Sequence, residues 1–138
     1  MENQIDYQKQ GKSNRRKGGE WERKVRKYLI EEGWIISKWN NNVDLEEGKI
    51  VQAKMKYNFF KKAMSIGTGF PDFVCIKPTN ELMFVECKLT GKLDRLEKQK
   101  MEWLESEGYD CWVAGKGEGG FVCLERPKKP IVKKEIET

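Results

Sequence analysis

The order of its predicted elements indicates an α/β fold, in which helices cover a mixed central sheet within a single domain. One helical pattern of apolar residues lies at 18–32, and another lies in the second half of the chain. Between and after these patterns come short apolar runs bounded by turn residues, which is typical of strands. The length of 138 residues suits one hydrophobic core.

The first helix is expected over residues 18–32. Trp21, Val25 and Leu29 recur at helical spacing, and Gly33 is a suitable stop. A strand is expected at 34–39, then a turn or loop at Asn40-Asn41-Asn42, and a further strand at about 50–55. Residues 57–70 mix aromatic, basic and glycine residues, so that 43–71 is the part of the chain with the weakest pattern.

The second half has a clearer pattern. Apolar runs predict strands at 73–77 and 82–88, separated by the turn Lys77-Pro78-Thr79-Asn80, and therefore a hairpin. A second helix is expected over 93–107, with Gly108 at its end. Further strands are expected at 109–114 and 121–124. A folded domain is thus predicted at 18–126, between a flexible basic arm at 1–17 and a charged tail at 127–138.

Composition excludes several classes of function. The chain contains no histidine, which excludes hydrolases that use a histidine base and leaves carboxylate-and-metal chemistry. The four cysteines form no C-x-x-C pair, so free thiols are expected rather than disulfides or a zinc site. The net charge of +5 suits a polyanionic partner. The sequence shows neither a membrane span nor a signal peptide, so a cytoplasmic protein is expected.

Two carboxylates and an ammonium group are predicted to meet in one small volume. Pro71-Asp72 precedes one strand of the expected hairpin, and Glu86-Cys87-Lys88 ends the other. Residues i and i+2 share a face of a strand, so Glu86 and Lys88 point the same way. Converging carboxylates bind a hard divalent cation such as Mg²⁺ through oxygen. A neighbouring lysine holds an attacking water or offsets phosphate charge.

These residues resemble the Pro-Asp … Glu-x-Lys pattern of the PD-(D/E)xK nuclease superfamily, and within it the VRR-NUC group. The similarity continues through Leu89-Thr90-Gly91-Lys92-Leu93, Gln99, Trp103-Leu104 and Gly108-Tyr109. Upstream, Gly18-Gly19-Glu20-Trp21-Glu22-Arg23 resembles the start of the first helix in archaeal Holliday-junction resolvases. The resemblance implies a restriction-endonuclease-like α/β/α fold and a nuclease domain at 18–126.

The resemblance also implies roles for individual residues. Asp72, Glu86, Lys88 and Gln99 would be catalytic, and Mg²⁺, with Mn²⁺ as a substitute, would be held by Asp72, Glu86, the Cys87 backbone carbonyl and a helix glutamate. Glu22 borders the buried face of the helix and is favoured over Glu20 for that ligand. The basic residues expected to contact DNA are Arg15, Arg16, Lys17, Lys54, Lys61 and Lys62.

The function expected from these features is metal-dependent, structure-selective cleavage of DNA in recombination, replication or repair. A homodimer acting on branched DNA, similar to a Holliday-junction resolvase, is the leading hypothesis, since paired cuts require two-fold symmetry. A flap or restriction-type endonuclease and a catalytically silent DNA-binding module are the alternatives. Neither a nucleotide cofactor nor a membrane partner is expected. The host compartment would be a prokaryotic cytoplasm, or that of an infected cell for a viral protein.

Overall fold

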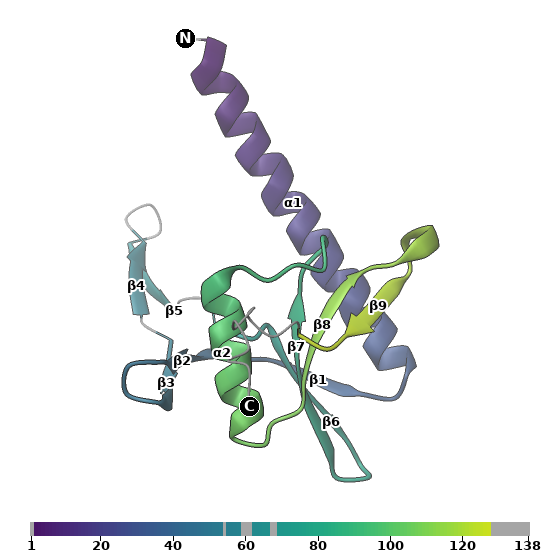
Figure 1. Ribbon diagram of the computed structural model, residues 1–138. Helices are drawn as coiled ribbons and strands as arrows, with labels where there is room; N and C mark the ends of the chain where they lie inside the picture. The colour runs from purple at the N-terminus through teal and green to yellow at the C-terminus, as the bar shows by residue number, and fades with distance from the viewer. Residues whose placement is uncertain (1, 54, 59–61, 67–68, 128–138) are drawn as a thin grey trace, which may run out of the picture.

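The computed structural model describes residues 2–53, 55–58, 62–66 and 69–127 of the chain. It contains two α-helices, one short 3₁₀ helix and nine strands (Figure 1). In order these are α1 (Glu2–Glu31), β1 (Ile35–Lys38), β2 (Asn41–Asp44), β3 (Lys49–Gln52), β4 (Met55–Asn58), β5 (Ala63–Ile66), β6 (Phe73–Lys77), β7 (Glu81–Cys87), α2 (Arg95–Ser106), β8 (Cys111–Lys116), η1 (Glu118–Gly120) and β9 (Val122–Glu125).

Five strands form the central sheet, in the order β1-β6-β7-β8-β9. β7 and β8 are parallel, with α2 in the connection between them, while the other neighbours are antiparallel. The sheet is therefore mixed, as the sequence predicts. The hairpin expected from the two apolar runs is β6–β7, with Phe73 opposite Val85.

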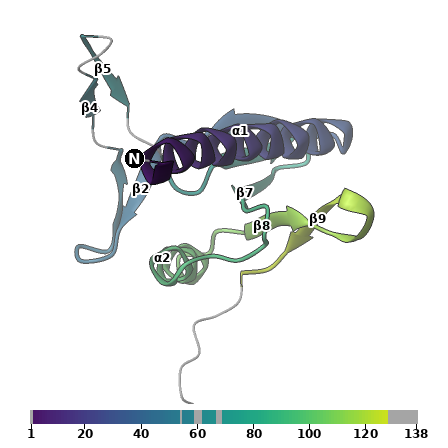
Figure 2. The same cartoon turned by 90° about the horizontal axis from the view of Figure 1, so that it is seen from above.

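The two helices lie on opposite faces of the sheet (Figure 2). Trp21, Val25 and Leu29 of α1 pack with side chains of β6, β7 and β8 on one face. Met101 and Leu104 of α2 pack with Phe84, Cys111 and Val113 on the other. The alternation of Met83, Phe84 and Val85 between these clusters is the period-two pattern of a strand buried on both faces. The α/β/α arrangement is thereby confirmed.

Helix α1 begins at Glu2 and not at Gly18, so the expected boundary of the first helix is wrong. Residues 2–17 contain no proline and many Gln, Lys, Arg and Glu residues, which have good helix propensity. An i,i+4 ion pair between Arg16 and Glu20 continues across the expected boundary. The segment expected to be a flexible arm is thus a helical extension that projects beyond the sheet (Figure 1).

The weakly patterned part of the chain contains two small hairpins, β2–β3 and β4–β5, outside the central sheet. The turn expected at Asn40–Asn42 is wrong, since Asn41 and Asn42 pair with Gln52 and Val51. Asparagine disfavours strands locally, but Val43, the next residue of β2, is buried in the α2-side core, and this packing overrides the preference.

All four cysteines are free, as predicted, with Cys75 and Cys111 buried. Neither helix, over the residues that the structure describes, is both long and apolar enough to cross a bilayer. The charged tail expected at 127–138 lies outside the described residues except for Pro127.

Candidate active site

Asp72 is held in place by close packing of the chain just before β6. The Phe70 amide donates to the Asn41 carbonyl at 2.8 Å, and the Trp39 amide donates to the Asp72 carbonyl at 2.9 Å. A Cβ atom on Gly69 would lie 2.1 Å from the Trp39 carbonyl oxygen, so only glycine fits there. The peptide bond between Phe70 and Pro71 is cis. These contacts fix the entry into β6 and with it the Asp72 side chain.

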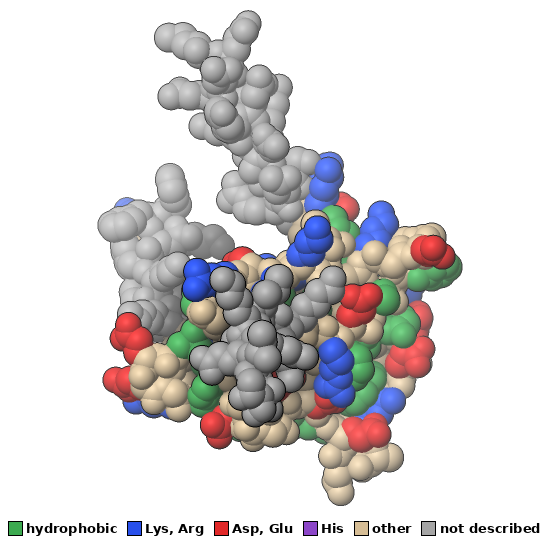
Figure 3. Space-filling model, in the orientation of Figure 1, with side chains coloured by type: hydrophobic (Ala, Val, Ile, Leu, Met, Phe, Trp, Pro, Cys, Tyr) green, Lys and Arg blue, Asp and Glu red, His purple; other side chains and the backbone are tan. Residues whose placement is uncertain are grey.

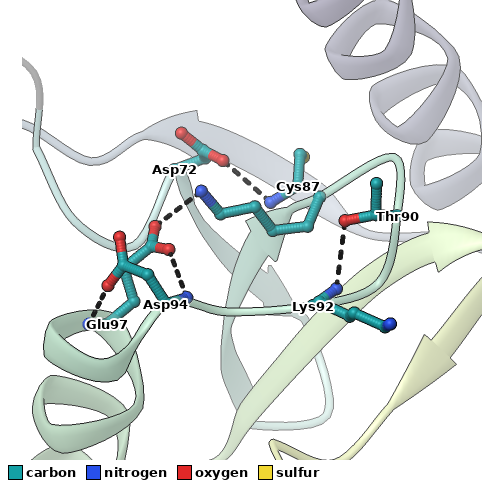
Figure 4. Close-up of polar contacts among 7 residues, drawn as sticks. Asp72, Cys87, Thr90, Lys92, Asp94 and Glu97 are labelled. Atoms are coloured by element: carbon teal, nitrogen blue, oxygen red, sulfur yellow. Dashed lines mark hydrogen bonds and ion pairs between the residues drawn. The ribbon is translucent and has the colours of Figure 1, made fainter.

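The Asp72 carboxylate lies at the centre of a group of acidic side chains. Its Oδ2 accepts a hydrogen bond of 2.8 Å from the Cys87 amide, which ties it to the end of β7 (Figure 4). The side chains of Glu22, from α1, and of Glu86 both lie within hydrogen-bonding reach of it. Three carboxylates, from α1, from the bend before β6 and from β7, thus meet at Asp72.

Glu86 is a buried acid, with only 4% of its surface exposed. It follows Phe84 on the face of β7 that α2 covers. Burial, the hydrogen bond with Asp72, and the negative charges of Asp72 and Glu97 raise its pKa far above the usual range, and Lys88 offsets this only in part. In the absence of a cation, Glu86 therefore carries a proton around neutral pH.

The structure places Glu22, and not Glu20, beside Asp72. Burial and the Asp72 charge raise the pKa of Glu22, against the opposing effect of Lys38 and Arg26. Glu20 is exposed and pairs with Arg16 at 3.9 Å. Of the two glutamates that the sequence left open, Glu22 is the one that joins the acidic group.

Lys88 continues from β7 on the same side as Glu86. Its ammonium group lies 2.7 Å from Glu97 Oε2. Burial alone would lower the pKa of Lys88, but the hydrogen bond and charge of Glu97, with Glu86 and Asp94, raise it. The lysine is therefore a cation over the whole physiological range. Asp94 and Glu97 stand at the start of α2 in Figure 4.

Sequence analysis missed Glu97. The signal was present, because Asp94-x-x-Glu97 ahead of an apolar helical pattern is a capping box. Gln99 was expected in the site instead, but it follows Glu97 by two residues, about 200° further round the helix. Its side chain is exposed. The structure does not bring Gln99 to the acidic group.

Cys87 contacts the acidic group through its backbone amide. Its side chain packs against the α1-side core, while its amide binds Asp72. Burial and the neighbouring carboxylates raise the pKa of the Cys87 thiol far above its usual range. The thiol is thus a protonated packing group rather than a nucleophile.

The acidic group fits a hard cation by its chemistry. Its donors are all oxygens, one of its acids is buried, and its mutual repulsion is what a divalent ion would relieve. Among the described residues, no group of three or more Cys, Asp or Glu side chains is arranged so that it could hold a metal ion. The oxygens that these residues offer to an ion are those of the Glu22, Asp72 and Glu86 carboxylates.

Basic side chains gather where α1 leaves the sheet (Figure 3). A hollow of about 390 Å³ is lined there by Lys17, Glu20, Trp21, Lys24, Leu89 and Lys116. Lys24 Nζ donates to the Gly120 carbonyl at 2.8 Å, and Trp21 Nε1 donates to the Ala114 carbonyl at 3.0 Å. Ala114 also accepts from the Lys88 amide at 3.1 Å, which links the hollow to the acidic group.

Of the residues expected to contact DNA, Lys17 lines this hollow, and Arg16 and Lys62 are exposed. The side chain of Arg15 lies outside the described residues, as do Lys54 and Lys61. Lys24 and Lys116 were missed by sequence analysis, because only the fold brings α1 next to the end of β8.

The VRR-NUC domain model matches residues 19–110, which is most of the chain and includes Glu22, Asp72, Glu86 and Lys88. The chain belongs to the VRR-NUC family. A VRR-NUC domain is a nuclease domain, which implies DNA as the substrate. No curated protein and no solved structure matches the chain.

Proposed function

We propose that this VRR-NUC protein is a Mg²⁺-dependent, structure-selective DNA endonuclease that acts on branched DNA in recombination, replication or repair, in the manner of a Holliday-junction resolvase. The single observation that carries the chemistry is the position of Asp72. Its carboxylate lies between Glu22 and Glu86 and is tied to the strand that leads into Lys88. Acidic oxygens beside an ammonium group suit hydrolysis of a phosphodiester.

In this proposal Asp72 and Glu86 would hold Mg²⁺. The Cys87 backbone carbonyl would add a ligand, and Glu22 would add a carboxylate ligand from α1. When bound, the ion supplies Lewis acidity toward the phosphate and lowers the pKa of a coordinated water. The acids of the chain set where the ion sits, since Asp72 is fixed through the Cys87 amide.

Lys88 acts directly on the reacting groups. An ammonium group has three donors, and one of them is used by Glu97, so two remain for a water or a phosphate oxygen. A fixed positive charge stabilises the negative charge that develops on the phosphate in the transition state.

The hollow beside α1 supports contact with the DNA backbone away from the cut. Lys17 and Lys24 lie seven residues apart and so share one side of the helix, while Glu22 points about 140–160° away from them. These lysines therefore contact a phosphate other than the scissile one. We expect them to contribute to DNA affinity and not to the chemical step.

A row of apolar side chains supports the homodimer. Ile35 lies opposite Ile76, and Ile76 lies opposite Leu82, so the three form one line across β1, β6 and β7. Their exposed fractions are 62%, 45% and 43%. An exposed apolar line of this kind suits an isologous contact, which would present two active sites with two-fold symmetry.

The deciding experiment is cleavage of a DNA panel in the presence of Mg²⁺, Mn²⁺ or EDTA. The panel contains a four-way junction, a flap, a fork, a linear duplex and a single strand. Paired, symmetric cuts in the junction support the proposal, and cutting of the flap alone moves the function to a flap nuclease. Metal-independent cutting contradicts the proposed site. Binding without cutting under any metal indicates a silent module.

Light scattering tests the dimer at the same time. We expect about twice the chain mass of 16.2 kDa at micromolar concentration. Ile76→Glu should shift the protein toward the monomer, whereas Ile30→Glu, an exposed apolar residue on α1, should not. A monomer that remains monomeric on junction DNA contradicts the resolvase hypothesis.

A further inference from the structure

We infer that Glu97 is a positioning residue for Lys88, holding its ammonium group beside the acidic group in a set orientation. This inference rests on the proposed function, because it assigns Glu97 a part in the same reaction. It extends the active site beyond the Glu-x-Lys motif to the first turn of α2.

The ion pair has the geometry of a specific contact. Lys88 Nζ lies 2.7 Å from Glu97 Oε2, which is at the short end for a charge-assisted hydrogen bond. The exposed fractions of the two side chains are 33% and 16%, so the contact is partly shielded from water. A lysine has a flexible four-carbon stem, and without an anchor its ammonium would sample several positions.

Glu97 is itself held in place through its other carboxylate oxygen. Oε1 accepts a hydrogen bond of 3.0 Å from the Asp94 amide, and Asp94 Oδ1 accepts one of 2.8 Å from the Glu97 amide. These two bonds form the capping box of α2. One oxygen of Glu97 therefore serves the helix, and the other serves Lys88.

The direction of the side chain follows from the packing of α2. Glu97 lies four residues before Met101 and seven before Leu104, the buried residues of the helix, and so it faces the sheet. Burial of Met101 and Leu104 thus fixes which way Glu97 points. The docking of α2 on the sheet is coupled in this way to the position of the Lys88 ammonium.

The charge of Glu97 is not needed for the cap. A glutamine at the same position of a capping box also accepts the amide hydrogen bond. Only the contact with Lys88 requires a carboxylate. This difference separates a positioning role from a structural one in a single substitution.

The first test is Glu97→Gln in the full chain, with Glu102→Gln as the matched control. Glu102 lies on the same helix and is exposed. Glu97→Gln should lower the single-turnover cleavage rate by about 10–100-fold, the scale seen for residues that orient a metal site from outside. DNA affinity and the urea midpoint should remain close to those of the unsubstituted protein. Glu102→Gln should alter none of the three.

The second test is a double-mutant cycle with Lys88→Met. If Glu97 acts through Lys88, the rate of the double variant should equal that of Lys88→Met alone. An equal fold-loss from Glu97→Gln in both backgrounds would overturn the inference, because Glu97 would then act independently of the lysine. A faster rate in Glu97→Gln would also overturn it, since Glu97 would then sequester the lysine.

The proposed function and the positioning role of Glu97 can be contradicted separately. If the unsubstituted protein cuts no DNA of the panel with Mg²⁺ or Mn²⁺, the proposed function fails. If it cuts and Glu97→Gln cuts at the same rate, the proposed function stands and the positioning role fails. A lower rate accompanied by a matching loss of urea midpoint would show a structural role and would also overturn the inference.

Discussion

The two halves of the site differ in their electrostatics: like charges lie together in one half, and opposite charges are paired in the other. The half formed by Glu22, Asp72 and Glu86 brings negative charges together and raises the pKa of both glutamates. The half formed by Lys88, Asp94 and Glu97 pairs its charges and completes a helix cap within hydrogen-bond distances. The first half is unfavourable until a cation arrives, and the second is already in place. The paired half of the site is therefore preorganised, and the acidic half is suited to binding a cation.

The largest effect should come from removing the charge of the acidic half. Asp72→Asn or Glu86→Gln should reduce cleavage below detection while DNA binding is largely kept, because basic residues elsewhere hold the backbone. Mg²⁺-dependent cleavage and a gel-shift assay measure the two properties. Full activity in either variant, or in excess EDTA, would contradict the division of the site described above.

A smaller loss is expected from the paired half. Lys88→Met should lower the single-turnover rate by about 10²–10³-fold, since it removes one electrostatic contact with the transition state. Mg²⁺ affinity, measured by calorimetry, should stay nearly unchanged. Lys88→Arg should restore only part of the rate, because a planar guanidinium group differs in shape from an ammonium group. Normal cleavage by Lys88→Met would make this lysine an ordinary surface cation.

The basic residues of the hollow lie outside both halves of the site. We expect them to affect only the affinity for DNA. Replacing Lys24 and Lys116 by glutamine should reduce the slope of log K against log salt by about 1.8, because each phosphate contact contributes about 0.9. The rate at saturating DNA should not change. A double variant of Lys27 and Lys98, basic residues outside the hollow, is the control. An unchanged slope would show that the hollow does not meet DNA.

The raised pKa values in the acidic half should make the stability of the protein depend on pH. The pKa values of Glu22 and Glu86 are higher in the folded protein than their usual value of about 4.5. Their contribution to stability is therefore present below pH 4.5 and is lost as the pH rises through the raised pKa values. Without metal, the urea midpoint should fall between pH 5 and pH 8.

Two comparisons sharpen this pH measurement. Glu86→Gln should flatten the dependence and stabilise the metal-free protein at pH 8 by roughly 1–3 kcal/mol, since folding at that pH no longer requires a buried carboxylate to take up a proton. Mg²⁺ should stabilise the unsubstituted protein more at pH 8 than at pH 5, but should have little effect on Glu86→Gln. A midpoint that rises with pH in the absence of metal would contradict the proposed electrostatics.

The last expected effect concerns the packing of the segment that holds Asp72, and it is tested at Gly69. Gly69→Ala places a methyl group against the Trp39 carbonyl and should destabilise the protein by about 1–3 kcal/mol. The segment that holds Asp72 would shift, whereas Lys88 and Glu97 lie on other elements. Urea unfolding with an activity assay measures both effects. A Gly69→Ala protein of unchanged stability would contradict the close packing described for this segment.

The sequence by itself determined the parts of the site that depend on local pattern. Short apolar runs separated by a turn predicted β6 and β7, and the period of two along a strand put Glu86 and Lys88 on one face. The helical spacing of Trp21, Val25 and Leu29 favoured Glu22 over Glu20, and the structure places Glu22 beside Asp72. These predictions succeeded because the period of a strand or helix relates a residue to its near neighbours in the chain.

Only the tertiary structure decided the contacts between distant segments. The rotation of α2 about its axis, set by burial of Met101 and Leu104, turned Glu97 toward Lys88 and left Gln99 exposed. The parallel pairing of β7 with β8 brought Lys116 to the same hollow as Lys17 and Lys24. Sequence periodicity does not specify which elements pack together or in what register. The burial of apolar side chains in the two cores determines which elements pack together. The Lys88–Glu97 half of the site depends on that packing.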